Sequence, residues 1–335
     1  MPCLRILGAR LCLAVSFSVL AMNDVFAAGS LEMRGALAGE RPRVVISTDI
    51  GGDDPDDIQS LVHYLMYADV FDTEGLISSA PAKGRVADIH RVIDAYEKDF
   101  EVLRRQSARY PEPNELRATV KQGAIDVAPA KGFSQPTEGS RWIVERAKAE
   151  SERPLWLLVW GSLTDVAQAV HDVPEIKARI RIYSIGSWNT AQDPAAREYL
   201  FREHPDLWWI ENDTTFRGMY LGGEQGGDLG NLEFVEKHVR PRGALGACFW
   251  EAKQDIKMGD TPSVLYLLRG TPMDPTKPSW GGRFVRTRED RPTYWHDDPD
   301  PQHRFAERNG AMHVNRWREE YLRDWQRRMA VLPLR

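Results

Sequence analysis

The segment from Ser47 to Asp57, with the sequence STDIGGDDPDD, holds the residues of this chain that point most directly to chemistry. Five aspartates fall within nine of its positions. Carboxylates held this closely repel one another unless a cation or shared protons relieve the repulsion. Ligands that are all oxygen, with no Cys or His among them, suit a hard cation such as Ca²⁺ or Mg²⁺. The segment therefore predicts a cation site.

Two other interpretations of this acidic segment stay open. Aspartate is favoured at helix N-termini, so two or three of these residues could serve as caps. A solvated acidic loop would have the same composition. An EF-hand does not fit, because its aspartate spacing and closing glutamate are absent. The glycine pattern of a dinucleotide site is missing as well, and Gly51 stands where a phosphatase Asp-x-Asp motif needs an acid.

The flanks of the segment predict how it is positioned. Residues 43–48 are β-branched and apolar, as in a buried parallel strand. After the segment, an apolar stripe with helical spacing predicts an amphipathic helix, and its members are Ile58, Leu61, Val62, Leu65 and Met66. A loop between a parallel strand and its following helix lies at the carboxyl edge of an open α/β sheet, where ligands bind.

The rest of the chain continues this alternation, which predicts a mainly parallel sheet flanked by helices. Further strands are expected at 75–79, 154–160, 179–184 and 207–210. Further helices are expected at 86–103, 140–150, 163–171, 261–268 and 315–329. Two stretches rich in proline and glycine, at about 107–139 and 270–310, are expected to be an irregular excursion and a long surface loop. We expect a single α/β domain over residues 28–335, because no clear linker interrupts it.

Composition limits the classes of function. The 335 residues are 42% hydrophobic and 28% charged, which is ordinary for a globular protein and excludes a disordered or fibrous chain. The net charge of −5 argues against nucleic acid as the main partner. A small-molecule substrate fits this balance better. The sequence leaves the oligomeric state open, a homo-oligomer included.

The N-terminus has the pattern of a secretory signal peptide. Arg5 and Arg10 precede an apolar run at 11–22, and small residues lead to a cleavage position after Ala27. The run is too short to span a bilayer as a helix. We therefore expect a periplasmic or secreted protein with no membrane association after cleavage of residues 1–27. An uncleaved anchor is the alternative.

The acidic segment resembles the N-terminal DxDxGxDD signature of the nucleoside hydrolases. It is more similar still to an exported bacterial group of nucleoside-hydrolase-like proteins, labelled cellulose- or sugar-binding. The motifs GDTPSVLYLL and WGSLTD at 259–268 and 160–165 extend the resemblance. The resemblance implies a Rossmann-like core, one Ca²⁺, and hydrolysis of an N-ribosyl or related glycosidic bond. A non-catalytic carbohydrate-binding protein on the same scaffold is the alternative function.

The resemblance implies a role for each matching residue. Asp49 corresponds to a calcium ligand that is also the general base toward a metal-bound water. Asp57 corresponds to a bidentate calcium ligand, and Asp260 to a distant acid that binds calcium and sugar. Thr164 corresponds to a threonine whose backbone carbonyl caps the metal.

Three residues are expected to contact the substrate. Asp56 and Asn189 correspond to family residues that bind sugar hydroxyls. Trp188 follows a predicted strand and precedes Asn189, so it is the best candidate for a stacking platform. Arg217 has two open interpretations, a salt bridge to the acidic pocket and a surface position.

The sequence also departs from the family pattern. Ser47 replaces the first aspartate of DxD, and Gly259 stands where many relatives have a histidine. These changes leave the metal site in place but remove support for leaving-group protonation. The loop after Asp49 is longer than in nucleoside hydrolases, so either 53–54 or 56–57 could be the acid pair. We favour 56–57, because Pro55 suits the first position of a helix and so places Asp56 and Asp57 in the first helical turn. Asp53 is then expected to be a dispensable loop residue.

The signal-peptide pattern gives the first testable prediction. Mass spectrometry of the exported protein should find its N-terminus at Ala28 or within one residue of it. An exported protein that retains Met1 would contradict this prediction.

Overall fold

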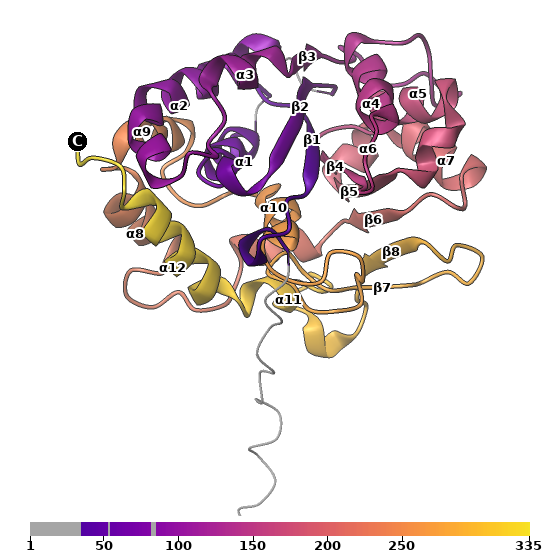
Figure 1. The fold of residues 1–335 in the computed structure, drawn as a ribbon. Helices are drawn as coiled ribbons and strands as arrows, with labels where there is room; N and C mark the ends of the chain where they lie inside the picture. The colour runs from indigo at the N-terminus through magenta and orange to yellow at the C-terminus, as the bar shows by residue number, and fades with distance from the viewer. Residues whose placement is uncertain (1–34, 53, 82–84) are drawn as a thin grey trace, which may run out of the picture. The chain divides into compact units, whose positions relative to one another are not determined.

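An eight-stranded sheet runs through the part of the chain that this computed structural model describes, residues 35–52, 54–81 and 85–335 (Figure 1). The order across the sheet is β3-β2-β1-β4-β5-β6-β8-β7. Neighbouring strands are parallel except that β7 runs antiparallel to β8. The strands are β1 (Arg43–Thr48), β2 (Asp72–Ser78), β3 (Val120–Gln122), β4 (Leu155–Val159), β5 (Ile180–Ile185), β6 (Trp209–Asn212), β7 (Phe284–Val285) and β8 (Tyr294–Asp297). The predicted α/β fold class is confirmed.

The strand order reverses between β1 and β4. These two strands pair in register from Arg43 opposite Leu155 to Ser47 opposite Val159. Every residue of both strands is buried, which explains their continuous apolar sequences. The chain leaves β1 toward one side of the sheet and leaves β4 toward the other, so the loops after the two strands diverge. This divergence opens a crevice at the carboxyl edge, the usual ligand position in such sheets.

Helices cover both faces of the sheet (Figure 1). Helices α1, α2 and α9 pack together on one face, and α4, α5 and α7 on the other. The helices are α1 (Asp56–Leu65), α2 (Val86–Gln106), α3 (Pro113–Ala118), α4 (Glu138–Lys148), α5 (Thr164–Asp172), α6 (Trp188–Gln192), α7 (Pro194–Glu203), α8 (Asn231–Phe234), α9 (Gly243–Ala252), α10 (Thr261–Leu268), α11 (Met312–Asn315) and α12 (Arg318–Met329). Short helical turns join them, and η4 (Thr215–Met219) enters the description of the site.

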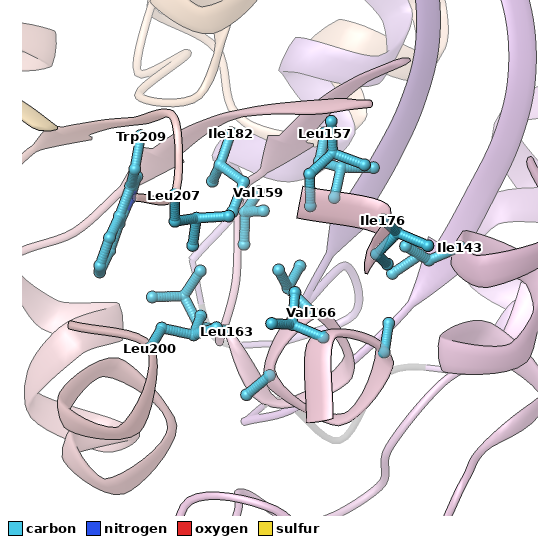
Figure 2. Close-up of a cluster of buried hydrophobic side chains, with 14 of the residues drawn as sticks. Ile143, Leu157, Val159, Leu163, Val166, Ile176, Ile182, Leu200, Leu207 and Trp209 are labelled. Carbon is cyan, nitrogen blue, oxygen red and sulfur yellow. The ribbon is translucent and has the colours of Figure 1, made fainter. Parts of the chain in front are cut away.

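A buried hydrophobic cluster holds the second face together. Figure 2 shows Leu157, Val159 and Ile182 of the sheet beside Val166 of α5 and Leu200 of α7. All five side chains are inaccessible or nearly so. The apolar stripes of α5 and α7 therefore fix these helices on the sheet, and the loops that precede them are fixed as a result.

The two stretches expected to lack regular structure contain short elements. The excursion at 107–139 includes α3 and the edge strand β3, and the expected surface loop at 270–310 includes β7 and β8. These strands have two to four residues, too few to show a periodic pattern. Pairing with β2 and β6 creates them, so tertiary context overrides the composition.

The predicted signal peptide, residues 1–27, lies outside the described residues. Within the described part of the chain, no helix combines the length and apolar character needed to cross a bilayer. Cys248 is free and partly buried.

Asp165 ties the 107–139 excursion to the fold. Its fully buried carboxylate accepts hydrogen bonds from Ser79 Oγ and Thr137 Oγ1, each at 2.5 Å, and from the amide of Ala124 at 3.0 Å. These donors come from the end of β2 and from two places in the excursion. A single charged side chain at the start of α5 therefore satisfies three donors from distant parts of the sequence.

The substitution Asp165→Ala should lower the free energy of unfolding by about 2–4 kcal/mol, because it leaves several buried hydrogen-bond donors without an acceptor at once. Denaturant titration would measure this change. Asp126→Ala is a matched control, since Asp126 is an exposed acid of the same excursion, and it should stay within about 0.5 kcal/mol. Equal effects of the two variants would contradict the role given to Asp165.

Candidate functional site

A cavity of about 670 Å³ opens at the carboxyl edge of the sheet, beside the reversal between β1 and β4. Its lining comes from the loops that follow β1, β4, β5 and β6 and from the segment before α10. The polar and aromatic members of this lining are Asp49, Asp54, Asp56, Asp57, Trp160, Ser187, Trp188, Asn189, Gln192, Phe216, Arg217, Tyr220, Lys257 and Asp260. The fold therefore gathers short segments from most of the chain around one space.

Four aspartates meet at this cavity. Carboxylate oxygens of Asp56, Asp57 and Asp260 lie within 4.8 Å of one another. Asp49 lies against them, since its carboxyl group shares a hydrogen bond with that of Asp57. The structure thus brings Asp260 to the acidic segment, as the cation-site interpretation requires.

Gln59 explains how Asp260 reaches the acidic segment. Its buried side chain on α1 accepts hydrogen bonds from the amides of Lys257 and Met258, at 2.9 and 3.2 Å, and donates to the carbonyls of Lys253 and Asp255. One amide group thereby holds the whole segment that leads into α10. No sequence motif identified Gln59, because its partners are backbone atoms about 200 positions away along the chain.

Burial and mutual repulsion raise the pKa values of these acids. Burial raises the pKa of Asp49 to about 7. The pKa values of Asp56, Asp57 and Asp260 also lie well above the ordinary range, first because of burial and then because of the neighbouring carboxylates. Oδ2 of Asp260 is buried and has no hydrogen-bond partner among the described residues. Clustered oxygen ligands with an unpartnered acceptor fit a hard divalent cation.

The start of α1 decides which acid pair belongs to the cluster. Asp56 and Asp57 form its first turn, where backbone amides and the helix dipole favour negative charge. Asp57 also accepts a hydrogen bond from the hydroxyl of Thr48. Asp54 also lines the cavity, but it pairs with Lys257 Nζ at 2.7 Å and is not one of the three clustered acids. The geometry therefore agrees with the 56–57 register, while Asp53 lies outside the described residues.

Thr164 is not among the residues that line the cavity. Its hydroxyl donates a hydrogen bond to Asp193 at 2.7 Å and accepts one from the amide of Ala128 at 3.1 Å. Both bonding directions of this hydroxyl are therefore used within the protein. Trp160, directly after β4, lines the cavity instead. Helix α5 begins at Thr164, four residues after Trp160, and this turn carries the chain away from the edge. The contact expected of Thr164 is through its backbone carbonyl, which these hydroxyl contacts do not test, so it stays a prediction.

Trp188 and Asn189 both line the cavity, but the Trp188 side chain is exposed whereas that of Asn189 is hydrogen-bonded within the protein. The Trp188 side chain is 57% exposed, which leaves a face open for stacking. The amide nitrogen of Asn189 donates to the carbonyls of Trp160 and Ile185, at 2.7 and 3.1 Å. Asn189 therefore joins the ends of β4 and β5, and only its oxygen remains for a ligand.

Gly259 explains one departure from the family pattern. A Cβ atom at this position would lie 2.4 Å from Oδ2 of Asp56. A histidine there would require Asp56 to move, so this chain keeps the acid and lacks the imidazole. Lys257, Tyr220 and Phe216 are cavity residues that the sequence analysis did not identify. No signal in the sequence marks them, because the loops that carry them meet only in the folded chain.

Comparison with known proteins agrees with this geometry. Residues 43–284 match the family model described as cellulose-binding Sde182, nucleoside hydrolase-like domain. The chain belongs to this Sde182 nucleoside hydrolase-like family. The resemblance seen in the acidic segment is thereby confirmed, and the match of the Sde182-like domain extends from β1 into β7. No curated protein matches the chain.

Solved structures share the Sde182-like fold. A nucleoside hydrolase-related protein from Saccharophagus degradans, associated with carbohydrate metabolism, has 24% identity and a TM-score of 0.69, and the match covers 87% of this chain and 72% of that one. The effector XopQ, solved with adenosine diphosphate ribose, has 12% identity and a TM-score of 0.54, with 88% and 95% covered. A plant nucleoside hydrolase has 15% identity and a TM-score of 0.51, with 87% and 99% covered.

Removal of divalent cations should make the stability of this Sde182-like protein fall as the pH rises. A carboxyl group whose pKa is raised by folding stabilises the folded state at low pH, and this contribution is lost as the pH passes from about 4 to the folded-state value near 7 for Asp49. A single such group contributes about 1.4 kcal/mol for each pH unit in that window. Thermal unfolding should be measured in EDTA and in Ca²⁺ from pH 5 to 7.5. The gap between the two melting temperatures should widen as the pH rises.

Asp54→Asn is the control for this measurement, because Asp54 pairs with Lys257 and its pKa is lowered by that contact rather than raised. The widening gap should persist in this variant and shrink in Asp260→Asn. A gap that is constant over the pH range would contradict the cation site.

Proposed function

We propose that this chain is an exported, Ca²⁺-dependent hydrolase of an N-ribosyl or related glycosidic bond. The observation that carries the proposal is the convergence of four aspartates at one cavity, three of them buried, with Asp260 Oδ2 left without a hydrogen-bond partner among the described residues. The nucleoside-hydrolase-like family and the carbohydrate association of the Saccharophagus relative support a sugar-containing substrate.

The donor set indicates which residues would hold the cation. Asp49, Asp57 and Asp260 would supply carboxylate oxygens, and Asp56, which is only partly buried, would bind sugar hydroxyls. The backbone carbonyl of Thr164 stays the neutral ligand that the family resemblance implies, and the carbonyl of Trp160, a residue that lines the cavity, is the alternative. When bound, Ca²⁺ acidifies a water molecule and orients sugar hydroxyls.

Asp49 is the residue proposed to accept a proton. It follows β1 directly, is held against Asp57 and faces the cavity. Cleavage of a glycosidic bond passes through an oxocarbenium-like state, which nearby carboxylates stabilise electrostatically. Trp188 offers an exposed ring beside the same space, and this ring would exclude water from one face of the sugar.

A carbohydrate-binding protein without catalysis is the second candidate. Gly259 favours it, because this position carries no imidazole to protonate a leaving group. The family description as cellulose-binding favours it too. The two candidates differ in one respect that can be measured, which is turnover under conditions where the protein binds the same sugar.

A panel of nucleosides, aryl glycosides and cello-oligosaccharides, assayed with Ca²⁺ and with EDTA, tests the proposal. Hydrolysis should depend on the cation, and Asp49→Asn should lower kcat by about 10²–10⁴ because it removes the base. Reducing-sugar release and calorimetric binding should be measured on the same preparation. Sugar binding with no turnover of any member would favour the binding protein and overturn the hydrolase.

Asp54→Asn serves as the control, because Asp54 belongs to the same acidic segment but is paired with Lys257. Its kcat should stay within a few-fold of the original. Equal losses in the two variants would show that general charge, rather than the position of Asp49, governs activity.

A further inference from the structure

A second group of three side chains, two of them cationic, lines the same cavity. It consists of Arg217, Tyr220 and Lys257. Tyr220 lies between the two cations, since Arg217 Nη1 donates to its hydroxyl at 3.2 Å and Lys257 Nζ lies 5.5 Å from its ring centroid. The chemistry proposed for the aspartates does not use these three residues.

The two cations differ in how their charge is satisfied. Lys257 donates to the carboxylate of Asp54 at 2.7 Å, so its charge is already paired. Arg217 donates to two neutral hydroxyls, those of Tyr220 and Ser187, each at 3.2 Å. Among the described residues, Arg217 forms no ion pair with any carboxylate, and its Nε is buried without a hydrogen-bond partner. Arg217 therefore presents an unpaired positive charge to the cavity.

The fold holds Arg217 in place without help from a ligand. Its turn, η4, is anchored at the start because Asp297 accepts hydrogen bonds from the amides of Thr214 and Thr215, at 2.8 and 3.0 Å. The amide of Phe216 donates to Asn212 Oδ1 at 2.8 Å. The guanidinium group also lies over the Phe216 ring, 4.9 Å from its centroid. A guanidinium fixed in this way loses little freedom on binding.

Its partner Ser187 is fixed as well, and at a conformational cost. Ser187 has φ 57° and ψ −107°, in a region that side-chain-bearing residues rarely adopt. The amide of Ser187 donates to Asp213 Oδ1 at 2.7 Å, and Asp213 also pairs with His296 at 3.0 Å. The strained turn places the Ser187 hydroxyl against Arg217, and the bond to Asp213 joins the loop after β5 to the loop after β6.

We propose that Arg217 binds an anionic group of the ligand, so that this cavity takes sugars or nucleosides that carry a carboxylate or a phosphate. The planar guanidinium matches the two oxygens of such a group, and charge-assisted hydrogen bonds of this kind are stronger than those to hydroxyls. The Ser187 and Tyr220 hydroxyls flank the same position as further donors. The inference rests on the proposed function only in taking the ligand to be a sugar derivative.

Paired ligands that differ only in the acidic group test this inference by binding. Calorimetry with Ca²⁺ present would compare ribose 5-phosphate with ribose, and glucuronate with glucose. The acidic member of at least one pair should bind more tightly, and which pair responds distinguishes phosphate from carboxylate. Raising NaCl from 50 to 500 mM should weaken binding of the acidic member and leave the neutral member unchanged.

Arg217→Gln should weaken binding of the acidic ligand by about ten- to a hundredfold and leave the neutral ligand within about twofold, because it removes a charge-assisted pair. Arg217→Lys keeps the positive charge but loses the planar guanidinium, so its affinity for the acidic ligand should lie between those of the original protein and Arg217→Gln. This variant gives a result even if Arg217→Gln folds poorly. Arg286→Gln, an exposed arginine outside the cavity lining, is the control with the same change in net charge.

Equal affinities of the original protein for acidic and neutral members, or no measurable affinity for any of the four, would overturn the inference. So would an unchanged preference in Arg217→Gln. Ca²⁺ binding and turnover are measured separately on the same preparations. Loss of the proposed hydrolase function would therefore appear as absent Ca²⁺ binding or turnover, even if the preference for acidic ligands were present.

Discussion

The repulsion among four clustered carboxylates, three of them buried, is the constraint on which the organisation of this site depends. Burial of one unpaired carboxylate is costly, and each further one raises the cost. The chain nevertheless brings Asp49, Asp56, Asp57 and Asp260 together in low-exposure positions. Such a cluster persists only with protons or a cation, so the fold and the ligand chemistry are coupled from the start.

The structure supports this cluster from several directions. Thr48 donates to Asp57, the first turn of α1 favours the charges of both its acids, and Gln59 holds the segment that delivers Asp260. Gly259 leaves room for Asp56 because it has no side chain. These contacts use backbone atoms and small polar groups, and they join the acids to β1, to α1 and to the segment before α10.

The cavity has two chemical characters, acidic at the end of β1 and cationic and aromatic around η4. Under the proposed function, the aspartates and Trp188 would provide the hydroxyl acceptors and the stacking surface that a neutral sugar needs. An unpaired arginine adds a requirement that a family described as cellulose-binding does not by itself suggest. The loops after β5 and β6 carry Ser187 and Arg217, which line this side of the cavity.

The sequence alone determined the parallel α/β core and the acidic segment as its centre. Long buried strands and amphipathic helices carry their own periodicity, so β1, α1, β4 and α10 follow from local pattern. It was also enough to prefer the 56–57 pair, because Pro55 limits where the helix begins. Tertiary structure alone decided the short strands β3, β7 and β8, which exist only through pairing. It also placed Trp160 rather than Thr164 at the cavity and Arg217 beside Ser187, because those contacts join distant loops and leave no trace in local sequence.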